Sequence, residues 1–238
     1  MALGWNPAPH TLKLDVFRID SHGVYRAQAL EELPWLTHGF GTRSSRDWPP
    51  GVAEVATLRQ IHSDKVLLAE HSGCHGEGDA LITNRPGIAL SIRTADCLPI
   101  LIADPAKRAI AAIHAGWRGT VQGIAPKTVR AMEEQFGSRP EDLVVVVGPG
   151  IGSCCFEAGP EVAAQFSGFF PERDDLTGRA KIDLVETTHR QLGRNDGAAR
   201  HFAASSLCTV CHGDLFHSYR RDRDAAGRMV TVIGIKNQ

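Results

Sequence analysis

The chain has 238 residues, a length that suits one large domain or two small ones. Its 26 Lys and Arg residues nearly balance its 27 Asp and Glu residues, which gives a formal net charge of −1. This balance lacks the basic excess by which proteins attract nucleic acids and anionic membranes, so we expect neither as a partner. The longest apolar run, residues 98–103, is far below the roughly 20 residues that span a bilayer.

The predicted strands are short apolar runs flanked by turn-forming residues. In chain order they cover residues 65–69, 88–92, 98–103, 109–114, 143–147 and 229–235. The five residues that link the third run to the fourth are a hairpin-length connection. We therefore expect those two strands to pair antiparallel.

The predicted helices are fewer. Residues 124–136 have apolar side chains near a 3.6-residue period and stop before Gly137, a plausible helix-ending glycine. Residues 161–166 follow a proline, and residues 183–192 begin with a capping-box pattern. Strands cluster without a regular βαβ alternation. This favours an α+β fold with a mixed, largely antiparallel sheet core flanked by helices, in a single domain over 1–238.

The start of the chain and its cysteines bear on the cellular compartment. Residues 1–10 lack the basic segment followed by an apolar core that marks a signal peptide. Without an export signal, cysteines are more often buried thiols, metal ligands or nucleophiles than disulfides. We expect a cytoplasmic protein. The six cysteines are Cys74, Cys97, Cys154, Cys155, Cys208 and Cys211.

Reactive side chains border predicted strands at three places. His62, Cys97 and His114 carry donors that zinc prefers, and a catalytic zinc takes three protein ligands and keeps one position open. Their separations of 35 and 17 residues match no local zinc-finger spacing. From the residues alone, a second interpretation therefore stands beside the zinc site. In it, His62 is a loop residue, Cys97 a small buried side chain and His114 a strand end.

Two of the same residues also fit a different chemistry. Cys97 could act as a nucleophile with His114 as its general base, and Asp96 or Asp79 could orient the imidazole. Such a thiolate needs a nearby cation to lower its pKa.

Three further segments have compositions that bear on ligand binding. Residues 39–45 combine glycines, hydroxyls and Arg43, which suits an oxyanion such as phosphate, although an ordinary polar turn has the same composition. Residues 148–152 are glycine-rich but lack the lysine of a phosphate-binding P-loop, so they predict only a loop that lines a pocket. Residues 220–224 alternate arginine with aspartate, which predicts a solvated loop of mixed charge.

The remaining cysteines do not form a familiar pattern. Cys208 and Cys211 make one C-x-x-C pair, which cannot complete a Cys₄ zinc site by itself. Cys154, Cys155 and His212 could supplement it, but there is no second pair with zinc-ribbon spacing. We therefore interpret these cysteines as packing residues.

Eight segments taken together resemble one known family. They run from about residue 38 to the C-terminus, in that family's order. They are HGFGTR (38–43), RQIHSDKV (59–66), GDALIT (78–83), TADCLPILIAD (94–104), AAIHAGWRGT (111–120), GPGIGSCCFE (148–157), CTVC (208–211) and FHSYRRD (216–222). The sequence is similar to the YfiH family, also called the laccase-domain or polyphenol-oxidase-like family and later assigned as purine nucleoside phosphorylases.

The resemblance implies a zinc ion (Zn²⁺) held by His62, Cys97 and His114. It also implies phosphorolysis of adenosine, inosine, guanosine and methylthioadenosine, with hydrolytic deamination of adenosine as a second activity. Purine nucleosides and phosphate are the expected partners. The older copper-oxidase label fits poorly, because a multicopper site needs many histidines and the sequence has no H-x-H pair.

Roles for the neighbouring residues follow as hypotheses. We assign phosphate binding to Arg43, Ser44 and Arg59, with Arg118 as a further cationic group at the reacting atoms. Asp79 and Asp96 are candidates for acid–base catalysis or for orienting a ligand imidazole. Three function classes remain open: a zinc nucleoside phosphorylase, a cysteine hydrolase or amidase, and a non-catalytic metal or nucleoside sensor. The sequence leaves the oligomeric state and the preferred nucleoside open.

Overall fold

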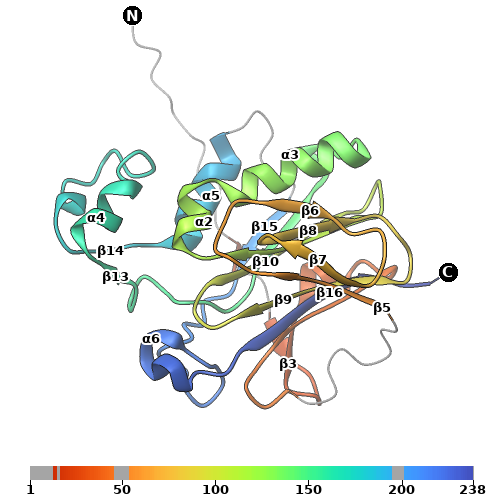
Figure 1. Ribbon diagram of the computed structural model, residues 1–238, viewed down its shortest axis with the longest axis horizontal. Helices are drawn as coiled ribbons and strands as arrows, with labels where there is room; N and C mark the ends of the chain where they lie inside the picture. Colours follow the sequence, from red (N-terminus) through yellow and green to blue (C-terminus); the bar gives the residue numbers. More distant parts are fainter. Residues whose placement is uncertain (1–12, 15–16, 46–53, 195–200, 238) are drawn as a thin grey trace, which may run out of the picture.

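Two seven-stranded sheets pack face to face, and helices cover the outer face of one of them (Figure 1). The computed structural model describes residues 13–14, 17–45, 54–194 and 201–237. The segment 1–10, on which the expectation of a missing signal peptide rests, lies outside the described residues. Among the helices that are described, none is both long enough and apolar enough to cross a membrane.

The inner sheet lies between the helices and the second sheet, and its strand order is β1-β15-β12-β10-β11-β8-β6. Its strands are β1 (Lys13–Leu14), β6 (Val66–Leu68), β8 (Ala80–Thr83), β10 (Leu98–Asp104), β11 (Ala109–Ala115), β12 (Val144–Val147) and β15 (His201–Ala204). The predicted hairpin is confirmed, since β10 and β11 pair antiparallel from Leu98 opposite Ala115 to Asp104 opposite Ala109.

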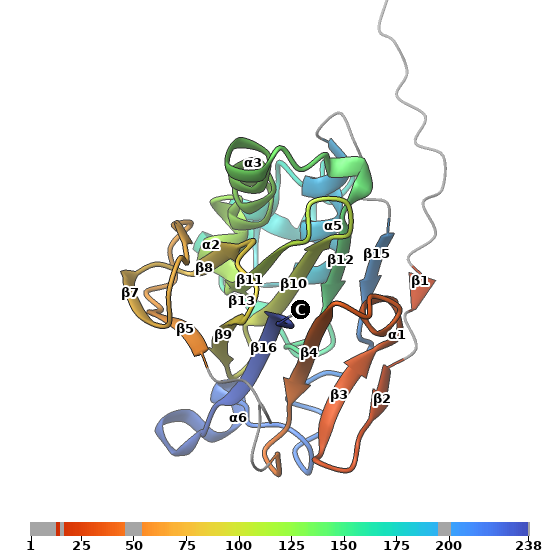
Figure 2. The same ribbon diagram turned by 90° about the vertical axis from the view of Figure 1, so that its right-hand side faces the viewer.

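The outer sheet has the order β2-β3-β4-β16-β9-β5-β7. Its strands are β2 (Phe17–Ile19), β3 (Val24–Ala27), β4 (Leu36–Gly41), β5 (Glu54–Arg59), β7 (Gly73–Glu77), β9 (Ile88–Thr94) and β16 (Met229–Ile235). The C-terminal strand β16 lies at the centre, between β4 and β9 (Figure 2). Because Val230 pairs with Arg93, the residues before β16 meet the residues that follow β9.

Strand β10 is buried on both faces. Ile100 and Ile102 pack toward the helices, whereas Leu101 and Ala103 pack between the two sheets. A strand covered on both sides reads as a continuous apolar run, because neither face needs polar side chains. This is why residues 98–103 stood out in the sequence.

The helices that cover the inner sheet are α2 (Trp117–Val121), α3 (Ile124–Phe136) and α5 (Leu184–Arg194). The prediction of α3 is confirmed at both ends, and Gly137 follows it with a φ of 68°. Helix α5 begins one residue later than predicted, because the Asp183 carboxylate caps it by accepting the Glu186 amide at 2.9 Å.

Shorter elements complete the chain. Three single-turn helices are α1 (Gln28–Glu31), α4 (Pro160–Ala163) and α6 (Tyr219–Asp222). The predicted helix 161–166 is split, since α4 passes into a 3₁₀ turn, Ala164–Phe166. Further 3₁₀ turns cover Pro140–Asp142, Asp175–Thr177 and Arg223–Ala225, and a small sheet pairs β13 (Glu157–Ala158) with β14 (Ala180–Lys181).

The predicted fold class is confirmed as α+β in a single domain, with antiparallel pairs outnumbering parallel ones. The sequence prediction lacked one feature of the architecture, which is the division of the strands into two stacked sheets. Several strands, among them β4, β5 and β7, were not predicted at all.

Candidate metal centre and its cavity

Three potential metal ligands meet where three strands end. His62 lies in the loop after β5, Cys97 lies between β9 and β10, and His114 lies near the end of β11. Their ligand atoms all lie within 4.8 Å of one another. The two imidazole rings meet edge to face, with 4.8 Å between their centroids. We call this set the His–Cys–His trio. It assembles through the fold, which explains why its sequence spacing matched no local zinc motif.

The backbone around the trio is close and strained. A Cβ atom at Gly116 would lie 2.9 Å from the Cys97 sulfur and 3.1 Å from the His62 ring, so only glycine fits there. His62 and Asp96 have positive φ angles of 60° and 84°, which are uncommon outside glycine. Strained backbone of this kind concentrates at functional sites, where the surrounding structure holds it in place.

The Asp79 carboxylate holds two members of the trio. It is fully buried and lies 2.8 Å from Nδ1 of His114. It also accepts the backbone amides of His62 at 3.0 Å and Ser63 at 2.6 Å, and the Ser63 hydroxyl at 2.7 Å. When Nδ1 of His114 donates to this carboxylate, Nε2 is left as a ligand atom, which is the arrangement that orients metal-binding histidines.

The charges in the trio depend on one another. Burial raises the pKa of Asp79, but hydrogen bonds from His114 and Ser63 outweigh it and lower that pKa to about 2. Burial lowers the pKa of His114, but hydrogen bonds with Asp79 and Cys97 raise it to about 9. Burial raises the pKa of Cys97, and hydrogen bonds with the two imidazoles bring it down to about 7. The site therefore favours a thiolate, the form in which cysteine binds metal or attacks a substrate.

The donor set fits zinc. One thiolate and two imidazoles suit its borderline-soft character, and three protein ligands with one open side are typical of catalytic zinc sites. The open side of the trio faces a cavity, since all three residues lie on its wall. A substrate could therefore reach a metal held here.

The cavity has a volume of about 720 Å³, within the range of small-molecule sites. Aromatic rings on its wall come from Trp117, Phe156 and Tyr219. Five arginines also line it: Arg93, Arg118, Arg220, Arg223 and Arg228. Within the described part of the chain, none of these five guanidinium groups forms an ion pair with a carboxylate. Positive charge without a protein counterion is what an anionic ligand requires.

The predicted acidic residues have different surroundings. Asp79 contacts the trio as described above. Asp96 lies on the cavity wall, but its carboxylate accepts hydrogen bonds from the Thr209 hydroxyl at 2.6 Å and the Arg220 amide at 2.6 Å. The Ser218 hydroxyl also donates to it, at 3.1 Å. Asp96 thus fastens the C-terminal segment to the wall of the cavity.

The predicted phosphate ligands are dispersed. Arg118 lies on the cavity wall, with its guanidinium 4.6 Å from the centroid of the Trp117 ring. Arg43 lies off the wall and donates to the Gly213 carbonyl. The Ser44 hydroxyl lies 3.1 Å from that of Thr42. Arg59 forms an exposed ion pair with Glu77.

Several cavity residues were missed from the sequence. Arg220 and Arg223 had been interpreted as part of a solvated loop, and within that loop Arg221 does pair with Asp222. The position of the predicted C-terminal strand in the sheet could have indicated that these arginines lie near the site. A strand placed at the sheet centre brings the segment before it to the end of β9. Gln60 was also missed, although its amide exchanges two hydrogen bonds, of 2.7 and 2.8 Å, with the backbone of Arg93.

Comparison with known proteins identifies the family. A family model described as multi-copper polyphenol oxidoreductase laccase matches residues 44–236. The chain belongs to this family.

Relatives in this family carry names that point to an activity. A purine nucleoside phosphorylase of Clostridium acetobutylicum is 35% identical over 193 residues, which are 80% of this chain and 80% of that protein. A purine nucleoside phosphorylase of Deinococcus radiodurans is 41% identical over 184 residues, which are 76% of this chain and 70% of that protein.

Solved structures of family members share the fold. YlmD from Geobacillus stearothermophilus aligns with a TM-score of 0.84 at 26% identity, covering 94% of this chain and all of that one. A Bacillus licheniformis protein named YfiH aligns with a TM-score of 0.81 at 28% identity, covering 92% of this chain and 99% of that one.

Proposed function

We propose that this protein is a zinc-dependent purine nucleoside phosphorylase. Its substrates are adenosine, inosine, guanosine and methylthioadenosine together with phosphate, and it deaminates adenosine as a second activity. The observation that carries the proposal is that one cavity holds the His–Cys–His trio, unpaired arginines and aromatic rings together. The names of the relatives support the same reaction class.

The arginines supply a site for phosphate. Phosphate is an anion with several acceptor oxygens, and guanidinium groups bind such oxygens in pairs with good geometry. We assign this role to Arg118 and Arg220 in particular. Arg118 is four residues from His114 in sequence, and the Arg220 backbone is fixed by Asp96. Arg43, Ser44 and Arg59 are the weaker candidates, because none of them lines the cavity and Arg59 is paired with Glu77.

The aromatic and apolar wall supplies a site for the nucleoside. Trp117 and Tyr219 offer flat faces on which a purine ring can stack, a contact that tolerates adenine, hypoxanthine and guanine alike. Leu58, Ile151 and Leu184 add apolar surface that excludes water from the sugar. Little base selectivity is expected from such a wall, which agrees with several purine nucleosides as substrates.

In phosphorolysis a phosphate oxygen forms a bond to C1′ of the ribose while the bond from C1′ to the purine nitrogen breaks. The electron pair stays on the purine, which takes up a proton, and ribose 1-phosphate is the other product. The arginines hold the phosphate beside C1′ and keep it oriented for attack. Asp79 keeps His114 and His62 in place while the charge moves. Zinc held by His62, Cys97 and His114 would supply Lewis-acid polarisation of a substrate atom.

A cysteine hydrolase or amidase is the second candidate. The specific observation in its favour is that Asp79, His114 and Cys97 are hydrogen-bonded in series, as an acid, base and nucleophile would be. His62 argues against it, because a nucleophile needs one base whereas two imidazoles approach this sulfur. Metal removal separates the two, since a thiolate nucleophile requires no zinc.

The test couples zinc quantification to adenosine turnover. Zinc-loaded protein with adenosine and phosphate should release adenine and ribose 1-phosphate, and without phosphate it should release inosine. Cys97→Ala should lose the zinc of the trio and both activities. Turnover of adenosine that persists after complete zinc removal, or the absence of all three products from zinc-replete protein, would contradict the proposal.

A further inference from the structure

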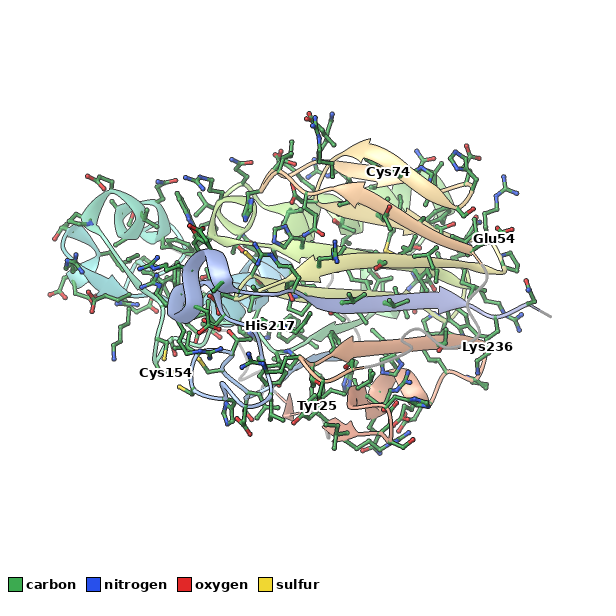
Figure 3. All side chains as sticks on the ribbon, turned by 60° about the horizontal axis from the view of Figure 1, so that its bottom comes forward. Tyr25, Glu54, Cys74, Cys154, His217 and Lys236 are labelled. Atoms are coloured by element: carbon green, nitrogen blue, oxygen red, sulfur yellow. The ribbon has the colours of Figure 1, made fainter. Side chains whose placement is uncertain are left out.

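A second group of potential metal ligands lies outside the trio. Cys154 and Cys155 come from the loop after β12, and Cys208 and Cys211 come from the turn after β15. All four sulfur atoms lie within 4.8 Å of one another, and none forms a disulfide. We call this group the cysteine cluster. Cys154, which is exposed and is labelled in Figure 3, marks the place of the cluster at the surface of the molecule.

The sulfur spacing matches a tetrahedral metal site. Zinc binds thiolate sulfur at about 2.3 Å, so two sulfurs on one tetrahedral zinc lie about 3.8 Å apart. The sulfur of Cys211 lies 3.4 Å from that of Cys155 and 3.7 Å from that of Cys154. The sulfurs of Cys154 and Cys155 are also 3.7 Å apart. A disulfide would need a sulfur–sulfur distance of about 2.05 Å, which none of these three distances approaches.

Backbone amides compensate negative charge on one of the four sulfurs, that of Cys208. The Gly152 amide donates to the Cys208 sulfur at 3.3 Å, and the backbone amides of Val210 and Cys211 also approach it. The guanidinium group of Arg221 donates to the carbonyl oxygens of Thr209 at 3.0 Å and Val210 at 3.2 Å, between the two cysteines of the C-x-x-C turn. Amide donors favour the thiolate form of Cys208, the form that binds metal, whereas burial raises the pKa of Cys154 and of Cys155.

We propose that Cys154, Cys155, Cys208 and Cys211 bind one zinc ion as a tetrathiolate site, separate from the catalytic trio. Four protein ligands leave no open position, so the site is structural. Binding displaces the thiol protons to solvent, and no oxidation is involved. The proposal departs from our interpretation of these cysteines as packing residues, and it does not depend on the reaction at the trio.

The position of the cluster indicates what the zinc does. It joins two loops that already touch, since the Thr209 amide donates to the Gly150 carbonyl at 3.0 Å. One loop brings Ile151 and Phe156 to the cavity wall, and the other leads to Tyr219 and Arg220. A zinc that links the two loops would therefore hold two walls of the cavity together.

Cysteine alkylation on the intact chain tests the proposal. Protein purified under reducing conditions and loaded with zinc is treated with an alkylating agent, and the modified cysteines are identified by mass spectrometry. We expect Cys74, which is exposed on β7, to react at once, and the four cluster cysteines to react only after a chelator removes zinc. Immediate reaction of the cluster would overturn the proposal. So would protection that only a reductant releases, because it would indicate disulfides.

Variants then locate the metal. The wild-type chain should hold about two zinc ions, one in each site. Cys211→Ser, at an exposed position, should lose one zinc and keep the zinc of the trio, and Cys74→Ser serves as the matched control that loses none. In Cys97→Ala, X-ray absorption of the remaining zinc should show only sulfur neighbours at about 2.3 Å. Nitrogen neighbours in that variant, or iron in place of zinc, would overturn the assignment.

Discussion

At the scale of single residues, Asp79 connects parts of the site that are far apart in the sequence. One buried carboxylate contacts both histidines of the trio, one through its ring and the other through its backbone amide. Its pKa of about 2 keeps it ionised at any working pH, so it cannot serve as a general acid. Of the two roles that the sequence had left open for Asp79, these contacts favour the one of positioning the ligands.

Replacing Asp79 by asparagine should weaken zinc binding while leaving the hydrophobic core intact. The amide cannot accept all of the same hydrogen bonds, and loss of such a supporting group typically costs about 10–100-fold in metal affinity. Competition with a chromogenic chelator measures the change at the trio.

Asp104→Asn is the matched control for that experiment. Asp104 is also fully buried and also accepts backbone amides, from Ala106 at 2.8 Å and Lys107 at 3.0 Å, but at the opposite end of the β10–β11 hairpin. The control should leave zinc affinity unchanged. Equal zinc affinity in Asp79→Asn and Asp104→Asn would contradict the positioning role.

The arginines give a second prediction at this scale. Arg118→Ala and Arg220→Ala should each raise the KM for phosphate about tenfold or more, because a charge-assisted hydrogen bond in a partly desolvated cavity is lost. Bound zinc and the deamination of adenosine should change much less. Arg43→Ala and Arg59→Ala serve as controls and should have little effect. The reverse pattern would return the phosphate site to the residues that the sequence first indicated.

How far the sequence predicts the candidate site depends on what each residue does. His62, Cys97 and His114 were selected as candidates because metal-ligand chemistry leaves few residue types to choose from, and the family resemblance pointed to the same positions; the structure brings their ligand atoms within 4.8 Å of one another. The arginines of the cavity could not be found in that way. An arginine is common on any surface, and only the folded chain shows that Arg220 lacks a carboxylate partner while Arg221 next to it has one.

At the scale of elements, the strands and helices that the sequence predicted are those that are buried along their whole length or that have one clearly apolar face. Strands β10 and β11 are buried along their whole length, and α3 has one clear apolar face. Strand β7 is mostly exposed and β5 is mostly half-buried, and neither alternates buried with exposed residues, so periodicity could not reveal them. Instead, β7 is held by pairing with β5, and β5 by pairing with β9, a contact between distant parts of the chain.

Strand β4 carries a histidine that should control stability in acid. His38 is 3% exposed, and its Nε2 accepts the Ala27 amide at 2.9 Å. Burial, with Arg26 and Arg18 nearby, lowers the pKa of His38 to about 3. Below pH 6.5 the unfolded chain takes up a proton there and the folded chain does not. Stability contributed by neutral His38 is therefore present above pH 6.5 and lost as the pH falls toward 3.

The measurement is urea unfolding at pH 7 and pH 5. The free energy of unfolding of the wild type should fall between pH 7 and pH 5. In His38→Gln, which keeps an acceptor for the Ala27 amide, this fall should be smaller by about 2 kcal/mol. His22→Gln, in the exposed turn before β3, is the control, and its free energy of unfolding should fall between the two pH values by as much as in the wild type. An unchanged pH dependence in His38→Gln would show that His38 does not carry this linkage.

At the scale of the whole molecule, the two sheets share one apolar layer. Leu101 from the inner sheet and Phe40 and Ile233 from the outer sheet belong to the same buried cluster. The trio also draws on both sheets, because His62 and Cys97 follow strands of the outer sheet and His114 belongs to the inner one. The site can therefore persist only while the sheets stay packed together.

Leu101→Ala tests this dependence. Removing a fully buried leucine side chain from between the sheets should lower the free energy of unfolding by about 2–5 kcal/mol. Leu68→Ala, at a position 38% exposed on β6, should change it by less than about 0.5 kcal/mol. Because the sheets share this layer, circular dichroism and tryptophan fluorescence should report one common transition in both variants. Separate transitions would mean that the sheets unfold independently. In that case, a chain with the inner sheet intact could keep His114 in place and still lose zinc, because His62 would no longer be held beside it.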